Sequence, residues 1–320
     1  MTASEAKEKE KHPHSGVGAL LSSVAFTALI FSAAIFLSDE IAEHVRRGLL
    51  ISVNVIIPSV LPFLLLGDFC VRFIRFESAA VFRQIFERLF NVNGAALPVF
   101  VCGILCGFPV GARLAVTMYK NGKISRCECE RLIAFANNAS PGYVICAVGM
   151  GLRGSLMDGI VLYAAMVLSS AITGVLIGIN KGKSNISNFI SWQSYSFVES
   201  VKSASIVCLQ ISAFVSVFSV AVGLIDRMIG SVIIKAAIIP FLEIGNAAAY
   251  LSDLCILSPC ISLALSSLAI SFSGLCVGAQ TLSIIDKGSD ISFKNYLPYK
   301  LIQGFVAAGI TLAFSIIKGL

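Results

Sequence analysis

Long apolar segments without a charged residue recur along the chain, and polar connections separate them. A helix needs about 20 apolar residues to cross a hydrocarbon core of about 30 Å. The segments of this kind are residues 17–37, 48–67, 132–152, 159–180 and 203–225, with a shorter one at 301–317. The pattern therefore predicts about six membrane-spanning helices.

Two further apolar stretches are too long for one ordinary span. Residues 89–119 are interrupted only by Arg113, and residues 254–285 contain no charge in 32 positions. The two stretches match at an offset of 167 residues, with seven identities in nineteen positions. Duplication explains the match better than chance, because it includes two glycines at one spacing and continues into a polar turn. The identities pair Gly107, Val110, Gly111, Ala112, Lys120, Ile124 and Ser125 with Gly274, Val277, Gly278, Ala279, Lys287, Ile291 and Ser292.

The order of segments around the two copies predicts an inverted repeat. If each glycine segment enters the membrane and returns without crossing, each half crosses an odd number of times, so the second half lies upside down relative to the first. We expect an all-α membrane protein with about six full transmembrane helices plus two re-entrant hairpins with broken helices. Its parts are a cytoplasmic tail (1–16), a first repeat (17–152, hairpin tip near 107–111) and a second, inverted repeat (153–320, hairpin tip near 274–278).

The positions of lysine and arginine favour hairpins over two ordinary spans. With hairpins and a cytoplasmic N-terminus, fifteen basic residues lie in inner segments and eight in outer segments. With ordinary spans the numbers become eleven and twelve, which removes the cytoplasmic excess that short loops normally show. In this topology Lys300 belongs to the outer segments.

The residues of the first glycine segment fit a reversal of the chain. Pro109 disfavours a helical conformation at Phe108, and Gly107 and Gly111 permit a tight turn. The alternative is a kinked spanning helix that packs closely on a neighbour, because Gly103, Gly107 and Gly111 form a Gly-x-x-x-Gly ladder. The charge distribution favours the hairpin, whose irregular tip must be surrounded by protein or by a water-filled cavity.

A second interruption is predicted inside the apolar segment 132–152. Asn137, Asn138 and Ser140 precede Pro141 and Gly142, so amides and helix-breaking residues lie near mid-membrane. A discontinuous helix frees backbone carbonyls on one side and N–H groups on the other, and these can hold a cation and an anionic or polar substrate. A kink whose amides bond to neighbouring helices is the alternative.

Charged and polar residues in other apolar stretches are further site candidates, because charges at membrane depth usually face a partner or a wet cavity. Arg113 begins the return arm, where the positive helix end would add to its attraction for an anion. An internal salt bridge with Glu243 is the alternative role for Arg113. The predicted substrate-binding residues are Gly107, Pro109, Gly111, Arg113, Asn137, Asn138, Ser140, Glu243, Asn246, Gly274, Gly278 and Gln280.

Composition narrows the classes of function. With 57% apolar and 13% charged residues among 320, the chain has more apolar surface than a soluble fold can bury. The net charge of +6 comes from loops beside apolar segments, which favours a membrane over nucleic acid as its cause. No Ser-His-Asp, Walker or dinucleotide motif is present. We expect no enzyme activity, no metal site and no cofactor apart from a coupling ion, Na⁺ or H⁺, that the sequence does not identify.

Several segments resemble the nucleoside-recognition (Gate) domain family, in its branch of sporulation integral membrane proteins of the YlbJ type. The resemblance is dense over residues 100–151 and patchier over 240–304, and Gly142 departs from the pattern, in which a bulkier residue often follows the proline. The segments that carry it are Gly107-Phe-Pro-Val-Gly-Ala-Arg113, Glu130-Arg-Leu-Ile-Ala-Phe-Ala-Asn-Asn-Ala-Ser-Pro141, Leu242-Glu-Ile-Gly-Asn246 and Ser273-Gly-Leu-Cys-Val-Gly-Ala-Gln280.

The resemblance implies a fold akin to concentrative nucleoside transporters and a role in the mother cell during spore formation. It further implies export of dipicolinate toward the forespore. We expect the protein to be integral to the inner (cytoplasmic) membrane or to the outer forespore membrane. Our leading hypothesis is a secondary transporter of a small anionic solute. The alternatives are a permease for nucleosides or other small polar solutes, and a non-transporting scaffold for spore morphogenesis. The expected partners are the solute and the lipid bilayer, without nucleic acid, and a homo-oligomer is left open.

Overall fold

The computed structural model describes residues 37–73, 80–179, 181–182, 196–254, 257–285 and 289–318, and these residues form helices and turns without a strand. The predicted tail 1–16 lies outside the described residues, as does the predicted span 17–37 except for Leu37. In chain order, the helices are α2 (Ser38–Ile51), η1 (Ser52–Ile56), α3 (Ile57–Phe73), α4 (Ala80–Phe90), η3 (Gly94–Ala96), α5 (Leu97–Leu105), α6 (Val110–Lys120), α7 (Arg126–Phe135), η4 (Gly142–Leu152), α8 (Leu156–Gly178), α9 (Phe197–Met228), α10 (Val232–Leu242), α11 (Ile244–Asp253), α12 (Pro259–Phe272), α13 (Gly274–Ile284) and α14 (Tyr296–Lys318).

Five helical stretches in the described part of the chain are long and apolar enough to cross a membrane. A sixth candidate is the pair Ala80–Phe90 and Gly94–Leu105, which bends by 106°. The prediction of an all-α, multi-pass membrane protein is confirmed. Its division into two inverted repeats stays a prediction. The five stretches are Ser38–Gly67, Leu156–Gly178, Phe197–Met228, Pro259–Ile284 and Tyr296–Ile317.

Serine side chains cap the N-termini of several helices. Ser125 caps α7 in a capping box, in which its hydroxyl accepts from the Glu128 N–H and the Glu128 carboxylate accepts from the Ser125 N–H at 2.7 Å. Ser155, Ser196 and Ser258 cap α8, α9 and α12 in the same way, without the reciprocal carboxylate bond. These oxygens satisfy N–H groups that have no partner within the helix, so the ends of the helices are encoded locally.

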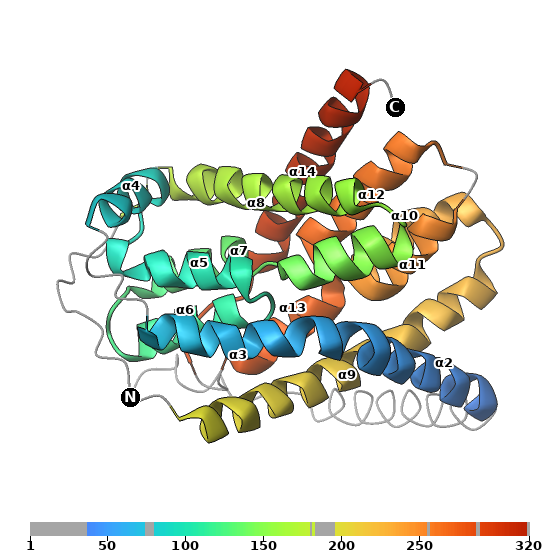
Figure 1. The fold of residues 1–320 in the computed structure, drawn as a ribbon, viewed down its shortest axis with the longest axis horizontal. Helices are drawn as coiled ribbons and strands as arrows, with labels where there is room; N and C mark the ends of the chain where they lie inside the picture. Colours follow the sequence, from blue (N-terminus) through green and yellow to red (C-terminus); the bar gives the residue numbers. More distant parts are fainter. Residues whose placement is uncertain are drawn as a thin grey trace, which may run out of the picture.

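The helices α2, η1, α3 and α9 form a long antiparallel pair, which we call the frame (Figure 1). The two sides approach closely through small residues. A Cβ atom built on Gly48 of α2 would lie 2.6 Å from the Ser216 Cα atom of α9, and one built on Gly223 of α9 would lie 2.2 Å from the His44 ring. Such close approach of backbones is how apolar helices associate in a membrane.

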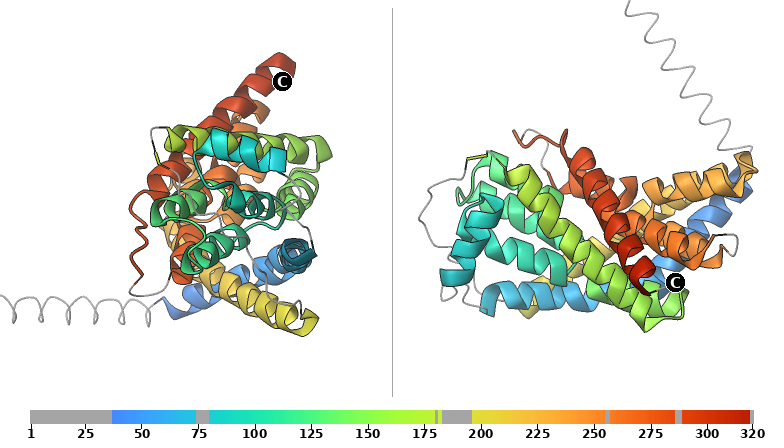
Figure 2. Two further views of the ribbon diagram at one scale, coloured as in Figure 1. Left: turned by 90° about the vertical axis from the view of Figure 1, so that its left-hand side faces the viewer. Right: turned by 90° about the horizontal axis from the view of Figure 1, so that it is seen from above.

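Most of the shorter helices lie between the frame and a second layer formed by α8 and α14, which pack against each other, while α4 lies beside α8 (Figure 2). Helices α4 to α7 occupy one end of the molecule in Figure 1, α10 to α12 occupy the other, and α13 lies between them. The rings of Phe90, Phe100 and Phe135 pack together at the first end, with centroids 5.1 to 5.7 Å apart, and join α4, α5 and α7. At the second end, Thr311 of α14 donates a hydrogen bond to Ser267 of α12 at 2.8 Å.

Candidate functional site

The chain folds back on itself between α5 and α6. A Cβ atom built on Gly103 would lie 3.3 Å from the Gly111 Cα atom, whereas eight residues of one straight helix would separate these positions by about 12 Å. Gly107, at the tip, has φ +82°, a conformation that favours glycine. The first glycine segment is therefore a reversal of the chain and not a kinked spanning helix.

The apolar segment 132–152 is interrupted as predicted. Helix α7 ends at Phe135 and η4 begins at Gly142, and the Ser140 hydroxyl accepts a hydrogen bond from the Tyr143 N–H at 3.3 Å. The α5–α6 fold-back packs directly on this break. Gly103 and Gly111 both face the Ala136 carbonyl, which leaves no space for a Cβ atom on either, and the tip at Gly107 faces Ser140.

A second fold-back lies between α10 and α11. The Tyr250 hydroxyl, well along α11, donates a hydrogen bond to the Val232 carbonyl at the start of α10 at 3.4 Å. Glu243 forms the tip between the two helices. Its carboxylate accepts from the Gly245 N–H at 2.8 Å and from the Asn246 N–H at 2.6 Å, and thereby caps α11.

The position of this second fold-back differs from the prediction, which placed a hairpin tip near Gly274 and Gly278. Ser273 and Gly274 have φ values of +75° and +71° and interrupt the helix between α12 and α13. The two helices nevertheless form one candidate span, Pro259–Ile284. The Gly274 break faces the second tip, because a Cβ atom built on Gly274 would lie 2.9 Å from the Leu242 carbonyl. Each fold-back thus packs on an interrupted helix.

The two tips, the first interruption and α13, which follows the second interruption, meet at one small cavity, the central cavity, of about 40 Å³. Glu243 is buried there, and the buried Tyr143 hydroxyl has no hydrogen-bond partner. The wall opposite the tips comes from the frame. The lining residues are Ile56, Val60, Phe108, Ala139, Ser140, Tyr143, Ile211, Val215, Glu243, Ile244, Val277 and Gln280.

Two other cavities lie on either side of the central cavity along α9. The Arg113 cavity, about 70 Å³, is lined by Arg113, Thr117 and Ser203 among others. The His44 cavity, about 220 Å³, is lined by residues that include His44, Arg47 and Asp226. From Ser203 to Asp226 the helix rises by about 35 Å, slightly more than the hydrocarbon core of a bilayer. The three cavities therefore form a row of about the length needed to cross a membrane.

The predicted site residues are divided among these features. Ser140, Glu243 and Gln280 line the central cavity, as Phe108 at the first tip does. Arg113 lies in its own cavity and donates to the Ser203 hydroxyl at 2.9 Å, so the alternative of a salt bridge with Glu243 does not describe its contacts. Gly107, Pro109 and Gly111 shape the first tip, Asn246 lines the His44 cavity, Gly274 lies at the second interruption, and Gly278 faces Tyr296 and Leu297.

Asn137 and Asn138 point away from the central cavity into a buried polar cluster. The Asn137 amide donates to the Thr281 hydroxyl at 3.0 Å, and the Asn138 amide donates to the Ser170 hydroxyl at 3.1 Å. The centre of this cluster is Lys300, which is fully buried. The sequence placed Lys300 in an outer segment, since a lysine beside an apolar stretch usually lies at the interface. The signal that could have revealed it is Gln303, three residues later on the same helix face.

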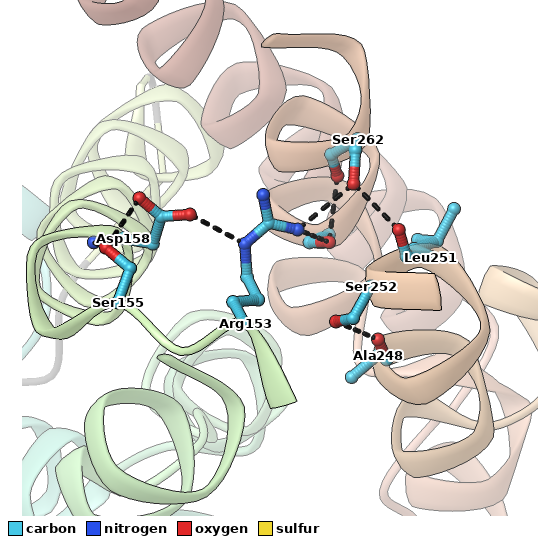
Figure 3. A network of polar contacts seen from close by, with 8 residues as sticks. Arg153, Ser155, Asp158, Ala248, Leu251, Ser252 and Ser262 are labelled. Carbon is cyan, nitrogen blue, oxygen red and sulfur yellow. Dashed lines mark hydrogen bonds and ion pairs between the residues drawn. The ribbon is translucent and has the colours of Figure 1, made fainter. Parts of the chain in front are cut away.

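A second polar cluster joins the first broken helix to the second, and Figure 3 shows it from close by. Arg153 follows η4 and lies between α8 and α12. Its Nε atom donates to the Asp158 carboxylate at 2.8 Å, and its Nη1 atom donates to the Ser262 hydroxyl at 3.0 Å. The cluster therefore links the end of η4 and the start of α8 to α12.

Comparison with known proteins agrees with the resemblance seen in the sequence. The chain is similar to the sporulation integral membrane protein YlbJ of Bacillus subtilis (strain 168), with 26% identity over 88% of this chain and 81% of that protein. The resemblance to the YlbJ type is thereby confirmed. No protein-family model matches the chain, and the Gate-domain part of the resemblance stays a prediction. No solved structure matches it.

Proposed function

We propose that this chain is a secondary transporter that moves a small anionic solute across a membrane during sporulation, with dipicolinate as the first candidate. The observation that carries the proposal is the row of three cavities along α9, with both tips, the first helix interruption and α13 at its middle. Interrupted helices near mid-depth are where secondary transporters hold their substrates. The link to sporulation rests on the similarity to YlbJ.

Arg113 supplies the positive charge that an anionic solute requires. Its guanidinium lies in the cavity at one end of the row, where its partner is the neutral Ser203 hydroxyl. Because this contact does not neutralise the guanidinium, its charge is available to an entering anion. Glu243 opposes an anion at the centre less than its charge suggests, since it accepts bonds from the Gly245 and Asn246 N–H groups at a helix N-terminus.

Transport requires the tips to move. The central cavity of about 40 Å³ has room for only about three water molecules, so an aromatic dicarboxylate enters only when the tips part from α9. Opening toward the Arg113 cavity and toward the His44 cavity in turn would give alternating access around the central cavity.

A neutral polar solute such as a nucleoside is the second candidate, and the lining of the central cavity favours it. Tyr143, Ser140 and Gln280 offer hydroxyl and amide groups there, and the Tyr143 hydroxyl is buried without a partner. These groups hydrogen-bond a solute without requiring it to be charged. If the solute is neutral, we expect its transport to depend on Glu243 rather than on Arg113.

Uptake into proteoliposomes distinguishes the two candidates. We expect Arg113→Gln to lower dipicolinate uptake by about tenfold or more, equivalent to about 1.4 kcal/mol of lost interaction, with an unchanged melting temperature. The matched control is Arg227→Gln, at the exposed end of α9, where the arginine pairs with Glu40. This control should transport normally.

Three outcomes separate the possibilities. Loss of dipicolinate uptake in Arg113→Gln alone supports the anion proposal. Uridine uptake that survives Arg113→Gln and is lost in Glu243→Gln supports the polar-solute alternative. Failure of the unmodified protein to move either solute contradicts a transport function of these kinds.

A further inference from the structure

Lys300, in the second turn of α14, is a fully buried lysine whose partners among the described residues are all neutral oxygens. Its Nζ atom donates to the Asn137 carbonyl at 2.6 Å, to Gln303 Oε1 at 3.0 Å and to Asn138 Oδ1 at 3.3 Å. Among the described residues, no carboxylate forms an ion pair with it. A buried ammonium without an acid is costly unless every one of its protons is bonded, and here three acceptors receive its three N–H groups.

The acceptors are held in place by other contacts. Gln303 Nε2 donates to Asn138 Oδ1 at 2.8 Å, and Asn138 Nδ2 donates to the Phe135 carbonyl at 2.8 Å. The Ser170 hydroxyl donates to the same Phe135 carbonyl at 2.6 Å. The three oxygens around Lys300 therefore form a pre-organised group, which we call the oxygen cage: the Asn137 carbonyl, Asn138 Oδ1 and Gln303 Oε1.

The oxygen cage has the chemistry of a monovalent cation site. One of its oxygens is a backbone carbonyl at a helix interruption, and the other two are side-chain amide oxygens. Unwound backbone carbonyls and neutral oxygens of this kind coordinate Na⁺ in secondary transporters, and hard cations in general prefer oxygen ligands. In this chain the position that such an ion would take is filled by an ammonium that is covalently part of α14.

We propose that the oxygen cage is a monovalent cation site whose cation is the tethered ammonium of Lys300, so that this protein takes no Na⁺ at its first helix interruption. The ammonium joins α14 to the broken helix permanently, whereas an exchangeable ion would join them only while it is bound. If the proposed transport function holds, solute movement is then independent of Na⁺ at this site. The cation site itself does not depend on that function.

Thermal unfolding of the purified, detergent-solubilised chain tests the proposal without any transport assay. Melting temperatures are measured in NaCl, KCl, LiCl and choline chloride at equal ionic strength. For the unmodified protein we expect no difference between choline and any alkali cation. For Lys300→Ala, which leaves the three oxygens without a cation, we expect a lower melting temperature in choline. We expect one alkali cation to raise it by at least about 3 °C in a saturable way.

Two further variants complete the design. Lys235→Ala removes a lysine that pairs with Asp226 outside the oxygen cage, and it should show no cation-specific shift. Lys300→Thr, with a short polar side chain, repeats the test should Lys300→Ala not yield folded protein. An Na⁺-specific rise in the unmodified protein overturns the proposal. The absence of alkali-cation rescue in both Lys300 variants, or their failure to fold in every salt, overturns it as well, because an ion then cannot replace the ammonium.

Discussion

Single glycines decide how closely the first fold-back approaches the broken helix. A Cβ atom on Gly103 would lie 1.7 Å from the Ala136 carbonyl oxygen, and one on Gly111 would lie 2.3 Å from the same atom. Neither backbone can yield without moving the break or the tip, because both are held by packing. The absence of a side chain at these two positions is therefore a requirement of the fold.

Gly103→Ala should lower the free energy of unfolding by about 1–3 kcal/mol, the usual cost of overpacking a tight contact. Thermal unfolding in detergent measures the change. The control is Gly309→Ala in the middle of α14, where a Cβ atom would meet nothing within 4 Å, and where alanine should stabilise the helix by up to about 1 kcal/mol. Equal melting temperatures for the two variants would contradict a tight contact between Gly103 and the Ala136 carbonyl.

Among the elements, the α10–α11 fold-back has the clearest topological consequence. Helix α9 ends at Met228 and α12 begins at Pro259, and a reversal between them brings both positions to one side of the membrane. A continuous helix through the 22 residues from Val232 to Asp253 would instead rise about 33 Å and place them on opposite sides.

Labelling with a membrane-impermeant maleimide tests this reversal in cells. The native Cys260, half exposed at the start of α12, and a cysteine at Gly230 should react from the same side. The chain used would have its other cysteines replaced. A cysteine at Ser196, at the far end of α9, should react only from the opposite side. Labelling of positions 230 and 260 from different sides would contradict the fold-back.

Much of the helical layout follows from the sequence, because apolar length is a strong signal. The segments 48–67 and 203–225 lie within helices that are candidate spans, and residues 159–178 of the segment 159–180 lie within another. The interruption at residues 136–141 was also predictable, since amides, proline and glycine together cannot continue an apolar helix. The second fold-back was not predictable in the same way. At its tip there is no glycine turn to mark the reversal. Instead, Glu243 ends the turn by capping α11 with its carboxylate.

The repeat match led to a wrong position for the second hairpin tip, and the reason is physical. Glycine allows both a reversal and a simple break, and Gly274 serves a break while Gly107 serves a reversal. Lys300 escaped prediction because its burial depends on Asn137 and Asn138, more than 160 positions away in the chain. Long-range contacts of this kind leave no local pattern.

At the scale of the whole molecule, the Arg153 cluster is a polar link between the first and the second broken helix (Figure 3). The Arg153 side chain is 9% exposed and is bonded to Asp158, whereas the Arg126 side chain is 45% exposed and is bonded to Glu130. The two arginines therefore make similar ion pairs in different surroundings. Solvent weakens the Arg126 pair much more than the Arg153 pair.

Arg153→Ala should lower the free energy of unfolding by about 1–3 kcal/mol, because it leaves Asp158 and Ser262 without a charged partner. Arg126→Ala should cost no more than about 1 kcal/mol. Denaturant-dependent unfolding in detergent compares the two variants. A loss for Arg153→Ala no larger than that for Arg126→Ala would mean that the cluster does not hold the two broken helices together.

The contacts between Gly48 and Ser216, and between Gly223 and His44, also bear on the mechanics of the protein. The first contact joins the backbones of α2 and α9, and the second places the His44 ring against the backbone of α9, so the two helices cannot slide or twist past each other without colliding. The helices of the frame can therefore move only together, as one rigid unit. Under the proposed transport function, the short inner helices would then be the part that moves relative to the frame.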